Sequence, residues 1–407
     1  SYWLINSTIS KNSSILGNIL THTDTSSHPH ISNTIIYNNT GNNISETFGA
    51  TSIVNISIIM GGFSGNANLN INPLFKDANS NDFTLQVTSP AINSGNNIAY
   101  ENAGFIAEAD KDLYGNTRLF DSIIDIGAYE YYEKIYPIRY VKVGGTGNGI
   151  SWDSASNNLQ AMINAKKVEE VWVAAGTYNS PTNGFNLKNN VAIYGGFPST
   201  NNPEFSDRNN IQNLTILSGG NTRRIFNNDF INDIYIDNSA ILDGFTLKDG
   251  SAIDGGAMKL VNASPTLSNL IFLSNTSIGS SNGGAIYCIA SSPKIEKCKF
   301  ISNTSGMYGG AIINLSNSTP IILNSLFTQN SANKGGAIFA AQNSSYSLVN
   351  STLYENTAQS GGAAYHIGSG TIPNIFNNII YGNSSSIVNT DSSSARMEQN
   401  LIQGITN

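Results

Sequence analysis

Apolar and polar positions in the second half of the chain recur with a period of about 26 residues. The tripeptide Gly-Gly-Ala marks this period, because it begins at positions 255, 283, 309, 335 and 361, in steps of 28, 26, 26 and 26 residues. A second marker lies in the other half of each period, at Asn275, Asn303, Asn330, Asn356 and Asn383. Self-similarity at a fixed spacing indicates a repeat protein whose units stack and bury one another's apolar side chains.

Each period contains two short apolar runs. One run follows the glycine pair, as in Ala285–Tyr287, and the other ends in an aromatic residue (Phe272, Phe300, Phe327, Tyr354 and Tyr381). The Gly, Ser, Asn and Thr residues between the runs favour turns, whereas Ile and Phe favour strands. The pattern therefore predicts an all-β protein, a right-handed parallel β-helix (solenoid), in which equivalent residues such as Ile286, Ile312 and Ile338 lie one above the next.

The repeat also predicts roles for individual residues. The first glycine of each pair is expected at a sharp corner with positive φ. The asparagines directly before the second strand are expected to form a hydrogen-bonded ladder that Lys297 interrupts (Asn269, Asn324, Asn350 and Asn377). Cys288 and Cys298 are expected as buried core residues, since their spacing matches no metal or redox motif. A disulfide between them is left open.

The N-terminal part follows the same pattern without the glycine pair. Its segment Ile31–Asn39 (ISNTIIYNN) closely matches Ile375–Asn383 (IFNNIIYGN). We therefore expect two consecutive β-helix segments. The expected parts are the last turns of a first β-helix (1–62), its C-terminal cap (63–132), a linker (133–138), the N-terminal cap of a second β-helix (139–170), and that second β-helix (171–407).

One short capping helix is expected, at Ser156–Val168. Leu159, Met162 and Ile163 lie on one face of it, and Ser156 or Asn157 is its expected N-cap. The final residues Asn400–Gly404 resemble Asn55–Ile59. This match predicts that the second β-helix is truncated at its C-terminal end and that the chain is a piece of a longer tandem array.

Composition narrows the classes of partner. Only 12% of the residues are charged and the formal net charge is −7, so no basic patch suggests nucleic acid or an anionic membrane surface. No apolar run approaches the roughly 18 residues that a membrane-spanning helix needs. We therefore expect neither a nucleic-acid partner nor a membrane span in this segment.

Several segments resemble bacterial parallel β-helix surface proteins. Gly145–Trp152, Asn158–Ile163 and Val171–Tyr178 resemble the opening of such proteins, and the Gly-Gly-Ala-Ile repeats are similar to those of polymorphic outer-membrane-type surface proteins. Asp112–Arg118, taken with Asp125–Glu130, resembles the choice-of-anchor Q domain found at the ends of such helices. The resemblance implies an exported protein at the cell surface, commonly in Bacteroidetes, and it implies no particular activity.

The acidic residues do not predict a catalytic site. From position 255 onward they are few, and we expect them at different phases of the period (Glu296, Glu355, Asp391 and Glu398). Glycoside hydrolysis needs two carboxyl groups about 5–9.5 Å apart in one groove. We therefore expect a protein that is not an enzyme and requires no cofactor. The alternative is a carbohydrate-active enzyme, either a polysaccharide lyase or a glycoside hydrolase, because such enzymes share the expected fold.

Two groups of residues are candidates for binding. Asp110, Asp112 and Asn116 present alternate oxygens before a glycine and are candidate Ca²⁺ ligands, although Asp side chains that cap their own backbone explain the same pattern. Acidic residues between positions 229 and 254 match no calcium loop.

Aromatic residues suggest the second candidate site. Tyr287, Phe339 and Tyr365 share a phase with Lys259 and are candidate ligand-binding residues, because outward rings can stack on sugars. We prefer Ile286 and Cys288 as the inward residues, since Lys259 would otherwise be buried.

The expected function is therefore non-catalytic. The chain is interpreted as an extracellular structural or adhesin segment of a large tandem-repeat bacterial surface protein. Its expected partners are tandem copies of itself within a longer chain, and glycans or a host or neighbouring cell surface bound along a polar flank.

Overall fold

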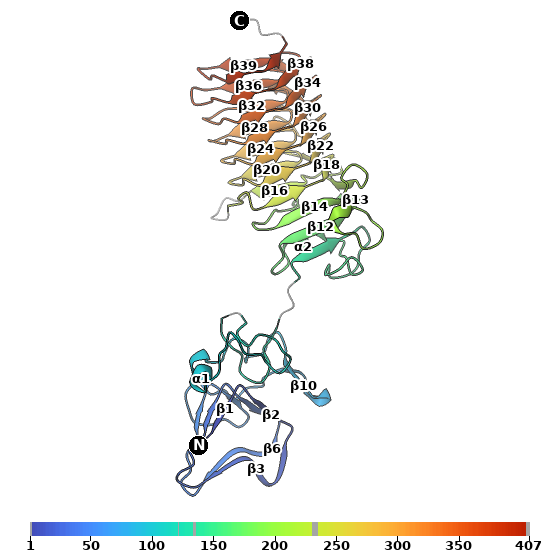
Figure 1. Ribbon diagram of the computed structural model, residues 1–407. Helices are drawn as coiled ribbons and strands as arrows, with labels where there is room; N and C mark the ends of the chain where they lie inside the picture. The colour runs from blue at the N-terminus through green and yellow to red at the C-terminus, as the bar shows by residue number, and fades with distance from the viewer. Residues whose placement is uncertain (1, 121, 133–135, 230–234, 404–407) are drawn as a thin grey trace. The chain divides into compact units, whose positions relative to one another are not determined.

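The computed structural model describes residues 2–120, 122–132, 136–229 and 235–403 (Figure 1). The chain divides into two compact units, unit 1 (Ser1–Lys134) and unit 2 (Ile135–Asn407). The division falls within the predicted linker 133–138, whose residues 133–135 lie outside the described residues. Each unit is described by itself.

Unit 2 is built from stacked parallel sheets that run along its length (Figure 1). Sheet I consists of β11 (Ile138–Val141), β12 (Glu170–Ala174), β14 (Ala192–Phe197), β17 (Ile241–Asp243), β21 (Thr266–Ser268), β25 (Lys294–Glu296), β29 (Ile321–Leu323), β33 (Ser347–Val349), β37 (Asn374–Phe376) and β40 (Arg396–Glu398). Sheet II consists of β13 (Gly176–Asn179), β15 (Thr215–Ser218), β18 (Thr246–Lys248), β22 (Ile271–Leu273), β26 (Lys299–Ile301), β30 (Leu326–Thr328), β34 (Thr352–Tyr354), β38 (Ile379–Tyr381) and β41 (Leu401–Ile402).

Two further sheets complete each turn of unit 2. Sheet III consists of β16 (Phe226–Asp229), β20 (Met258–Val261), β24 (Ile286–Ile289), β28 (Ile312–Leu315), β32 (Ile338–Ala340), β36 (Ala364–Ile367) and β39 (Ile387–Thr390). Sheet IV consists of β19 (Ser251–Ala252), β23 (Thr276–Ser277), β27 (Thr304–Ser305), β31 (Ser331–Lys334) and β35 (Thr357–Ser360).

Unit 1 contains a short stack of parallel β-helix turns and a segment packed on it. Its stacked strands are β1 (Trp3–Ile5), β4 (His30–Ser32) and β7 (Ile53–Asn55), then β2 (Thr8–Ser10), β5 (Ile35–Tyr37) and β8 (Ile58–Ile59), and the pair β3 (Ser13–Thr23) and β6 (Thr40–Thr47). The covering segment carries β9 (Phe75–Asp77), a 3₁₀ turn (Ala78–Ser80), β10 (Asp82–Leu85) and α1 (Asn97–Asn102).

The register confirms the predicted stacking. Ile286 pairs with Ile312, and Ile312 pairs with Ile338, in adjacent parallel strands of sheet III. All three side chains are fully buried in one continuous core, together with Cys288. The all-β parallel β-helix is therefore the fold of this protein, and its core is a set of vertical side-chain columns.

The two glycines of each pair are required for different steric reasons. The first glycine of each pair has positive φ, as predicted, for example 67° at Gly309 and at Gly335. The second glycine lies against the turn above, since a Cβ at Gly310 would lie 2.1 Å from the carbonyl oxygen of Gly336. No other residue fits there, because the backbones of successive turns are in direct contact.

The predicted asparagine ladder is at a different position. The predicted ladder residues lie at corners and have the left-handed conformation, with φ of 51–57° (Asn269, Asn324, Asn350 and Asn377). Lys297, at the corresponding corner of its own turn, has the same conformation with φ of 54°. The ladder forms instead at the marker asparagines (Asn275, Asn303, Asn330, Asn356 and Asn383). Within it, the Asn330 amide donates to Phe300 O and Asn356 Oδ1, both at 2.9 Å.

The five aromatic residues that end the second apolar runs fall into two groups. Phe272, Phe300 and Phe327 form a buried stack with ring centroids 4.6 Å apart. Leu353 and Ile380 continue that column, whereas Tyr354 and Tyr381 lie one position later and are exposed. A shift of one residue in a strand moves a side chain to the other face.

The capping helix of unit 2 is shorter than predicted. Helix α2 spans Leu159–Ile163, and Leu159 and Ile163 are buried in the core as expected. The N-cap is Asn158, which accepts a hydrogen bond from Ala161 N, rather than Ser156 or Asn157. The sequence interpretation missed α1 in unit 1, where Asn96 is the N-cap and accepts from Ala99 N. A short 3₁₀ turn also occurs at Phe205–Asp207.

Three buried residues with titratable side chains lie in the core. Cys288 and Cys298 are free thiols, and burial raises the pKa of Cys298 to about 12, so both act as small apolar side chains. His366 is fully buried, with its ring nitrogens 2.8 Å from Tyr346 Oη and 2.7 Å from Asn389 Oδ1. Burial lowers the pKa of His366 to about 4, so this ring is neutral at pH 7.

Asn330→Ala is expected to destabilise unit 2 by about 3 kcal/mol. The substitution removes two donated bonds and leaves the Asn303 amide and backbone N–H, which donate to Asn330 Oδ1, without an acceptor. Denaturant unfolding of the full chain measures the loss. The matched control is Asn333→Ala at an exposed position of the same turn, and an equal loss in both variants would contradict the role of the ladder.

The stability of unit 2 is expected to fall as the pH drops from 6.5 to 4. His366 binds a proton more weakly when folded than when unfolded, so its contribution is present above pH 6.5 and is lost toward pH 4, by roughly 3 kcal/mol. Denaturant unfolding at pH 7 and pH 4.5 tests this for the native chain and for His366→Gln. The variant should show a smaller pH dependence, and identical slopes would refute the prediction.

Candidate functional site

The predicted aromatic residues lie on the outer side of sheet III. Tyr287 pairs with Lys259 and Ile313, and Phe339 pairs with Ile313 and Tyr365, so all five share one outward column. The neighbouring positions Ile286 and Cys288 face the core, as preferred from the sequence. Tyr287, Phe339 and Tyr365 form a separate hydrophobic cluster with Ile313.

This outward column is largely covered. Tyr287 is 9% exposed, and Phe339 and Tyr365 are each 5% exposed. The Tyr308 ring, which precedes Gly309, stacks on Phe339 with centroids 4.6 Å apart, and Phe339 stacks on Tyr365 at 5.7 Å. The rings therefore stabilise one another more than they offer an open stripe to a ligand.

A groove of about 340 Å³ remains beside these rings. Its floor is apolar, and its polar residues are Asn282, Lys334 and Gln342. The ammonium group of Lys334 lies 4.9 Å from the centroid of Tyr365 and 3.4 Å from its phenol oxygen. No lining residue of this groove, all of which the structure describes, carries a carboxyl group. The groove can bind a polar ligand and has no acid–base pair for hydrolysis.

The sequence interpretation missed Tyr308 and Lys334. Both directly precede a glycine pair, in the position that Asn282 occupies one turn earlier. That position lies beside the outward column because the chain bends sharply at the first glycine. The periodic position of these residues was therefore an available signal.

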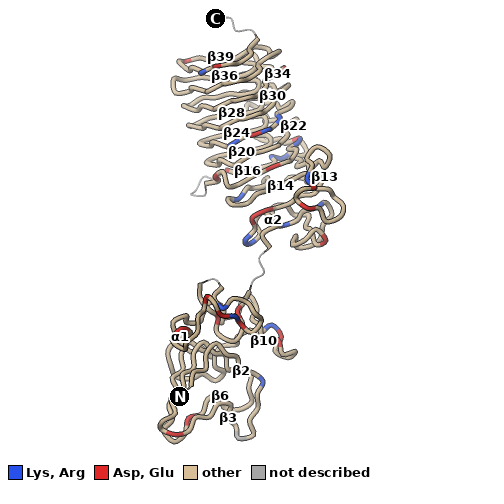
Figure 2. Tube along the Cα trace, in the orientation of Figure 1, with Lys and Arg blue, Asp and Glu red and all other residues tan. Residues whose placement is uncertain are grey.

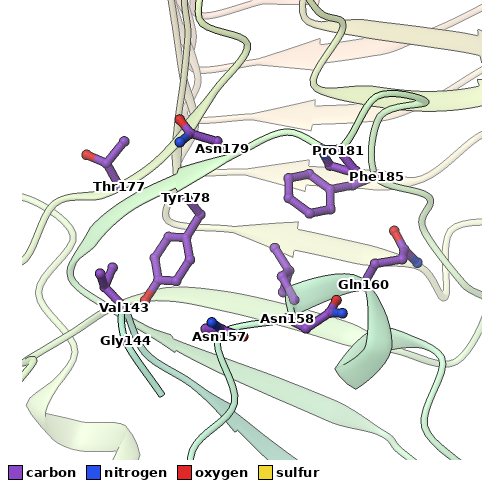
Figure 3. Close-up of a pocket in the computed structure, with 11 residues that line it drawn as sticks. Val143, Gly144, Asn157, Asn158, Gln160, Thr177, Tyr178, Asn179, Pro181 and Phe185 are labelled. Atoms are coloured by element: carbon purple, nitrogen blue, oxygen red, sulfur yellow. The ribbon is translucent and has the colours of Figure 1, made fainter. Parts of the chain in front are cut away.

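A second groove, of about 400 Å³, lies at the N-terminal cap of unit 2 (Figure 3). Side chains of Asn157, Asn158 and Gln160 face Tyr178 and Phe185 across it (Figure 3). Tyr178 is its one ionisable lining residue, and its hydroxyl donates to Ala174 O at 3.0 Å. Burial raises the pKa of Tyr178, so this groove also lacks a group that titrates near pH 7.

Glu296 and Glu398, both in the described part of unit 2, do not form a catalytic pair. The expectation that Glu296 and Glu398 differ in phase is wrong, because both lie in one column of sheet I through Leu323, Val349 and Phe376. They are four turns apart, about 19 Å at the ordinary strand spacing, which is too far for glycoside hydrolysis. The turns that carry β28 and β36 show almost no charge (Figure 2).

Asp243 shares that column two turns before Glu296, roughly 10 Å away at the strand spacing. Asp243 forms an ion pair with Arg208 and accepts from Asn269 Nδ2 at 2.7 Å. A hydrogen bond from Lys294 lowers the pKa of Glu296, so Glu296 is not suited to be a general acid. The sequence search missed this pair because it began at position 255.

The remaining acidic residues of this region also have local partners. Asp229 pairs with Lys259 at 2.5 Å, Asp249 pairs with Lys248 at 3.4 Å, and Asp254 accepts from Asn282. Asp237 accepts from Ser239, and Asp233 lies outside the described residues. Within the described ranges, no group of three His, Cys, Asp or Glu side chains is placed to hold a metal ion.

The candidate calcium ligands lie in the covering segment of unit 1. Asp112 Oδ1 accepts from Tyr114 N and Asn116 N, and Oδ2 accepts from Asn116 Nδ2 and Glu130 N, at 2.8–3.1 Å. Asp110 Oδ2 accepts from Ile106 N and Tyr100 Oη. The structure thus brings Asp112 and Asn116 together and directs Asp110 elsewhere, which favours a backbone-capping role. Calcium binding by Asp110, Asp112 and Asn116 stays a prediction.

The same segment contains a buried ion pair that the sequence motif had not explained. Arg118 lies 3.0 Å from Glu130 Oε1, both side chains being almost fully buried, and Glu130 Oε2 accepts from Asp125 N. Burial and the neighbouring Asp125 raise the pKa of Glu130, and the hydrogen bond from Arg118 opposes this by stabilising the carboxylate. The two motifs Asp112–Arg118 and Asp125–Glu130 therefore form one polar core.

Asp112→Ala is expected to destabilise unit 1 by about 3 kcal/mol, because four N–H donors lose their acceptor. Thermal unfolding is measured with and without about 5 mM Ca²⁺, a concentration that would saturate a weak calcium site. Comparing the loss of stability in the two buffers distinguishes the two candidate roles. The exposed Glu108→Ala variant is the control. A backbone role predicts the same loss in both buffers, whereas stabilisation by Ca²⁺ that Asp112→Ala abolishes would favour a calcium site.

Comparison with known proteins identifies no family for this chain. No family model matches this sequence, and no curated protein matches it. A search of solved structures finds the crystal structure of pectate lyase Pel9A, 15% identical over 65% of this chain and 79% of that chain, with a TM-score of 0.25. A likeness this weak carries no argument about activity. Among the described residues, no helix is long and apolar enough to cross a membrane. The chain is an all-β parallel β-solenoid.

Proposed function

We propose that this chain is a non-catalytic structural segment of an extracellular bacterial surface protein. In this proposal, β-helices follow one another along a longer chain, and a choice-of-anchor Q-type segment, residues 63–132, covers the end of one of them. The carrying observation is the continuous parallel pairing of strands in sheet I and sheet II up to β40 and β41. Such stacking gives each turn main-chain hydrogen bonds to both neighbours.

The grooves support this proposal over the enzyme alternative. Neither the groove beside Phe339 nor the groove beside Tyr178 is lined by a carboxyl group in the part of the chain that the structure describes. The best-placed carboxylates, Asp243 and Glu296, are each held by a basic partner. A polysaccharide lyase or glycoside hydrolase needs a free acid or base beside its substrate.

Glycan binding is a second candidate function, and the Lys334 groove favours it. Its apolar floor, its amide side chains and a single ammonium group offer stacking, hydrogen bonding and attraction for an acidic sugar. The groove spans several turns of sheet III, so an extended oligosaccharide is the ligand class that fits its chemistry. Of the three candidate ligand-binding residues, Phe339 and Tyr365 then contribute to the floor, and Tyr287 does not line this groove.

A glycan array and a depolymerisation screen on the full chain separate the candidates. The expected result is no cleavage of any polysaccharide, together with binding of acidic oligosaccharides that Lys334→Ala weakens about tenfold. Lys299→Ala, an exposed lysine on sheet II, is the matched control and should leave binding unchanged.

Two results would decide against these proposals. Release of sugar products that Asp243→Asn or Glu296→Gln abolishes would establish the enzyme alternative. Failure of every array glycan to bind would remove the glycan candidate and leave the structural proposal as it stands.

A further inference from the structure

The last turns of unit 2 repeat the last turns of unit 1 residue by residue. β37 pairs with β40 as β4 pairs with β7, and β38 pairs with β41 as β5 pairs with β8. A tyrosine lies twenty residues before a histidine in both units, and each Tyr Oη lies 2.8 Å from the His Nε2, in the pairs Tyr2–His22 and Tyr346–His366. The two sets of turns are therefore the same structural element.

The structural register corrects the match made from the sequence. Leu401–Ile402 pair with Ile379 and Ile380, as Ile58–Ile59 pair with Ile35 and Ile36. Asn400 is thus equivalent to Ser57, whereas the sequence match with Asn55–Ile59 was displaced by two residues. Gly404, the end of that match, lies outside the described residues.

In unit 1 the outer face of β5 and β8 is covered. Ile35 and Ile58 are fully buried. They belong to a hydrophobic cluster with residues of the covering segment (Phe75, Leu85, Ala91 and Ile126). Contact is very close at one point, where a Cβ on Gly127 would lie 2.8 Å from Ile35 Cδ1 and 3.0 Å from Thr8 Oγ1.

Corner asparagines fix the same segment through hydrogen bonds. Asn33 Nδ2 donates to Asn96 O at 3.0 Å, and Asn96 N donates back to Asn33 Oδ1 at 2.8 Å. Asn6 Nδ2 donates to Asp125 O at 3.1 Å. Both asparagines are buried at left-handed corners, with φ of 44° and 49°. The covering segment thus packs on one apolar face and hydrogen-bonds to the side-chain amides of two corner asparagines.

In unit 2 the equivalent face is open. Ile379 and Leu401, the counterparts of Ile35 and Ile58, are 47% and 64% exposed. The corner amides Asn350 and Asn377, the counterparts of Asn6 and Asn33, are exposed at φ of 51° and 57°. Thr352 takes the place of Thr8. Every residue type at the closest contacts is therefore kept except that Leu replaces Ile at position 401.

We propose that Ile379, Leu401, Thr352, Asn350 and Asn377 form a docking face for a second copy of residues 63–132. Ile379 and Leu401 would contact the copy's Phe75, Leu85, Ala91 and Ile126, and Asn377 would exchange hydrogen bonds with its Asn96. The evidence for this occupant is that the same segment already covers the same face in unit 1. The proposal rests on the longer chain of successive β-helices put forward under the proposed function, and it does not depend on glycan binding.

The connection between β8 and the covering segment in unit 1 indicates how a copy would be attached to unit 2. In unit 1 it follows β8 after Met60, Gly61 and Gly62, and both glycines have positive φ, 88° and 79°. Leu69 N then donates to Ser57 O and Ile59 N donates to Leu69 O, both at 2.8 Å, so the segment also covers the end of the last turn. A copy joined in the same way would follow β41 directly.

The test is a full chain in which residues 61–132 are repeated directly after Gln403. Hydrogen exchange of the amides in β38, β40 and β41 is compared between this extended chain and the native chain. We expect exchange to slow about tenfold or more in the extended chain, because the open face and the last turn become covered. Leu401→Asp and Ile379→Asp, each made in the extended chain, should abolish that protection.

Controls separate docking from unrelated stabilisation. Ile321→Asp, at an equally exposed position on sheet I outside the docking face, should leave the protection intact. Leu401→Asp in the native chain should leave its unfolding midpoint unchanged, because that side chain is exposed there. The proposal is overturned if the appended copy brings no protection or if the protection survives both Asp substitutions. It is also overturned if the native chain self-associates in a way that Leu401→Asp abolishes.

Discussion

The structure depends on the vertical pairing of identical positions in successive turns. Each strand of sheets I to III donates and accepts main-chain hydrogen bonds with the turns on both sides, so a residue's neighbours are mostly its own equivalents one period away. This constraint favours chemically similar neighbours within an inward column. Phe300 stacks on Phe327 with ring centroids 4.6 Å apart, and Asn303 bonds to Asn330, so close packing and hydrogen bonding repeat from turn to turn.

Polar columns inside the solenoid follow from the same constraint. The first four marker asparagines (Asn275, Asn303, Asn330 and Asn356) are buried. Each of their amides donates to the asparagine of the next turn and to a main-chain carbonyl, so their burial carries little desolvation penalty. His366 breaks a column that contains Cys288, Asn314 and Ala340, and it is tolerated because Tyr346 and Asn389 lie within hydrogen-bonding distance of its nitrogens. The ladder amides and His366 therefore have partners, whereas the buried Asn314 side chain in the same column has no hydrogen-bond partner among the described residues.

Function in such a fold has to lie on the outer faces. The outer column of sheet III is apolar and covered by the residues that precede the glycine pairs, which leaves a groove beside Lys334. The outer column of sheet I carries Asp243 and Glu296, each paired with a basic residue. The outer face of β38 and β41 is apolar and open, in contrast to its equivalent in unit 1. These three faces differ because outward residues are not constrained by the core.

The sequence by itself determined the period, the parallel β-helix and the inward column of Ile286, because a repeated residue at a fixed spacing can satisfy the stacking constraint in one architecture only. It also determined the glycine corners, since positive φ and direct backbone contact both require that residue. Tertiary structure alone decided which asparagines form the ladder, because corner and ladder asparagines differ in φ and burial and not in residue type. It likewise decided that Tyr365 is covered, that Glu296 and Glu398 share a column, and that Ile379 is open where Ile35 is buried. Each of these depends on what lies above or beside the residue in space, which a single period of the sequence does not contain.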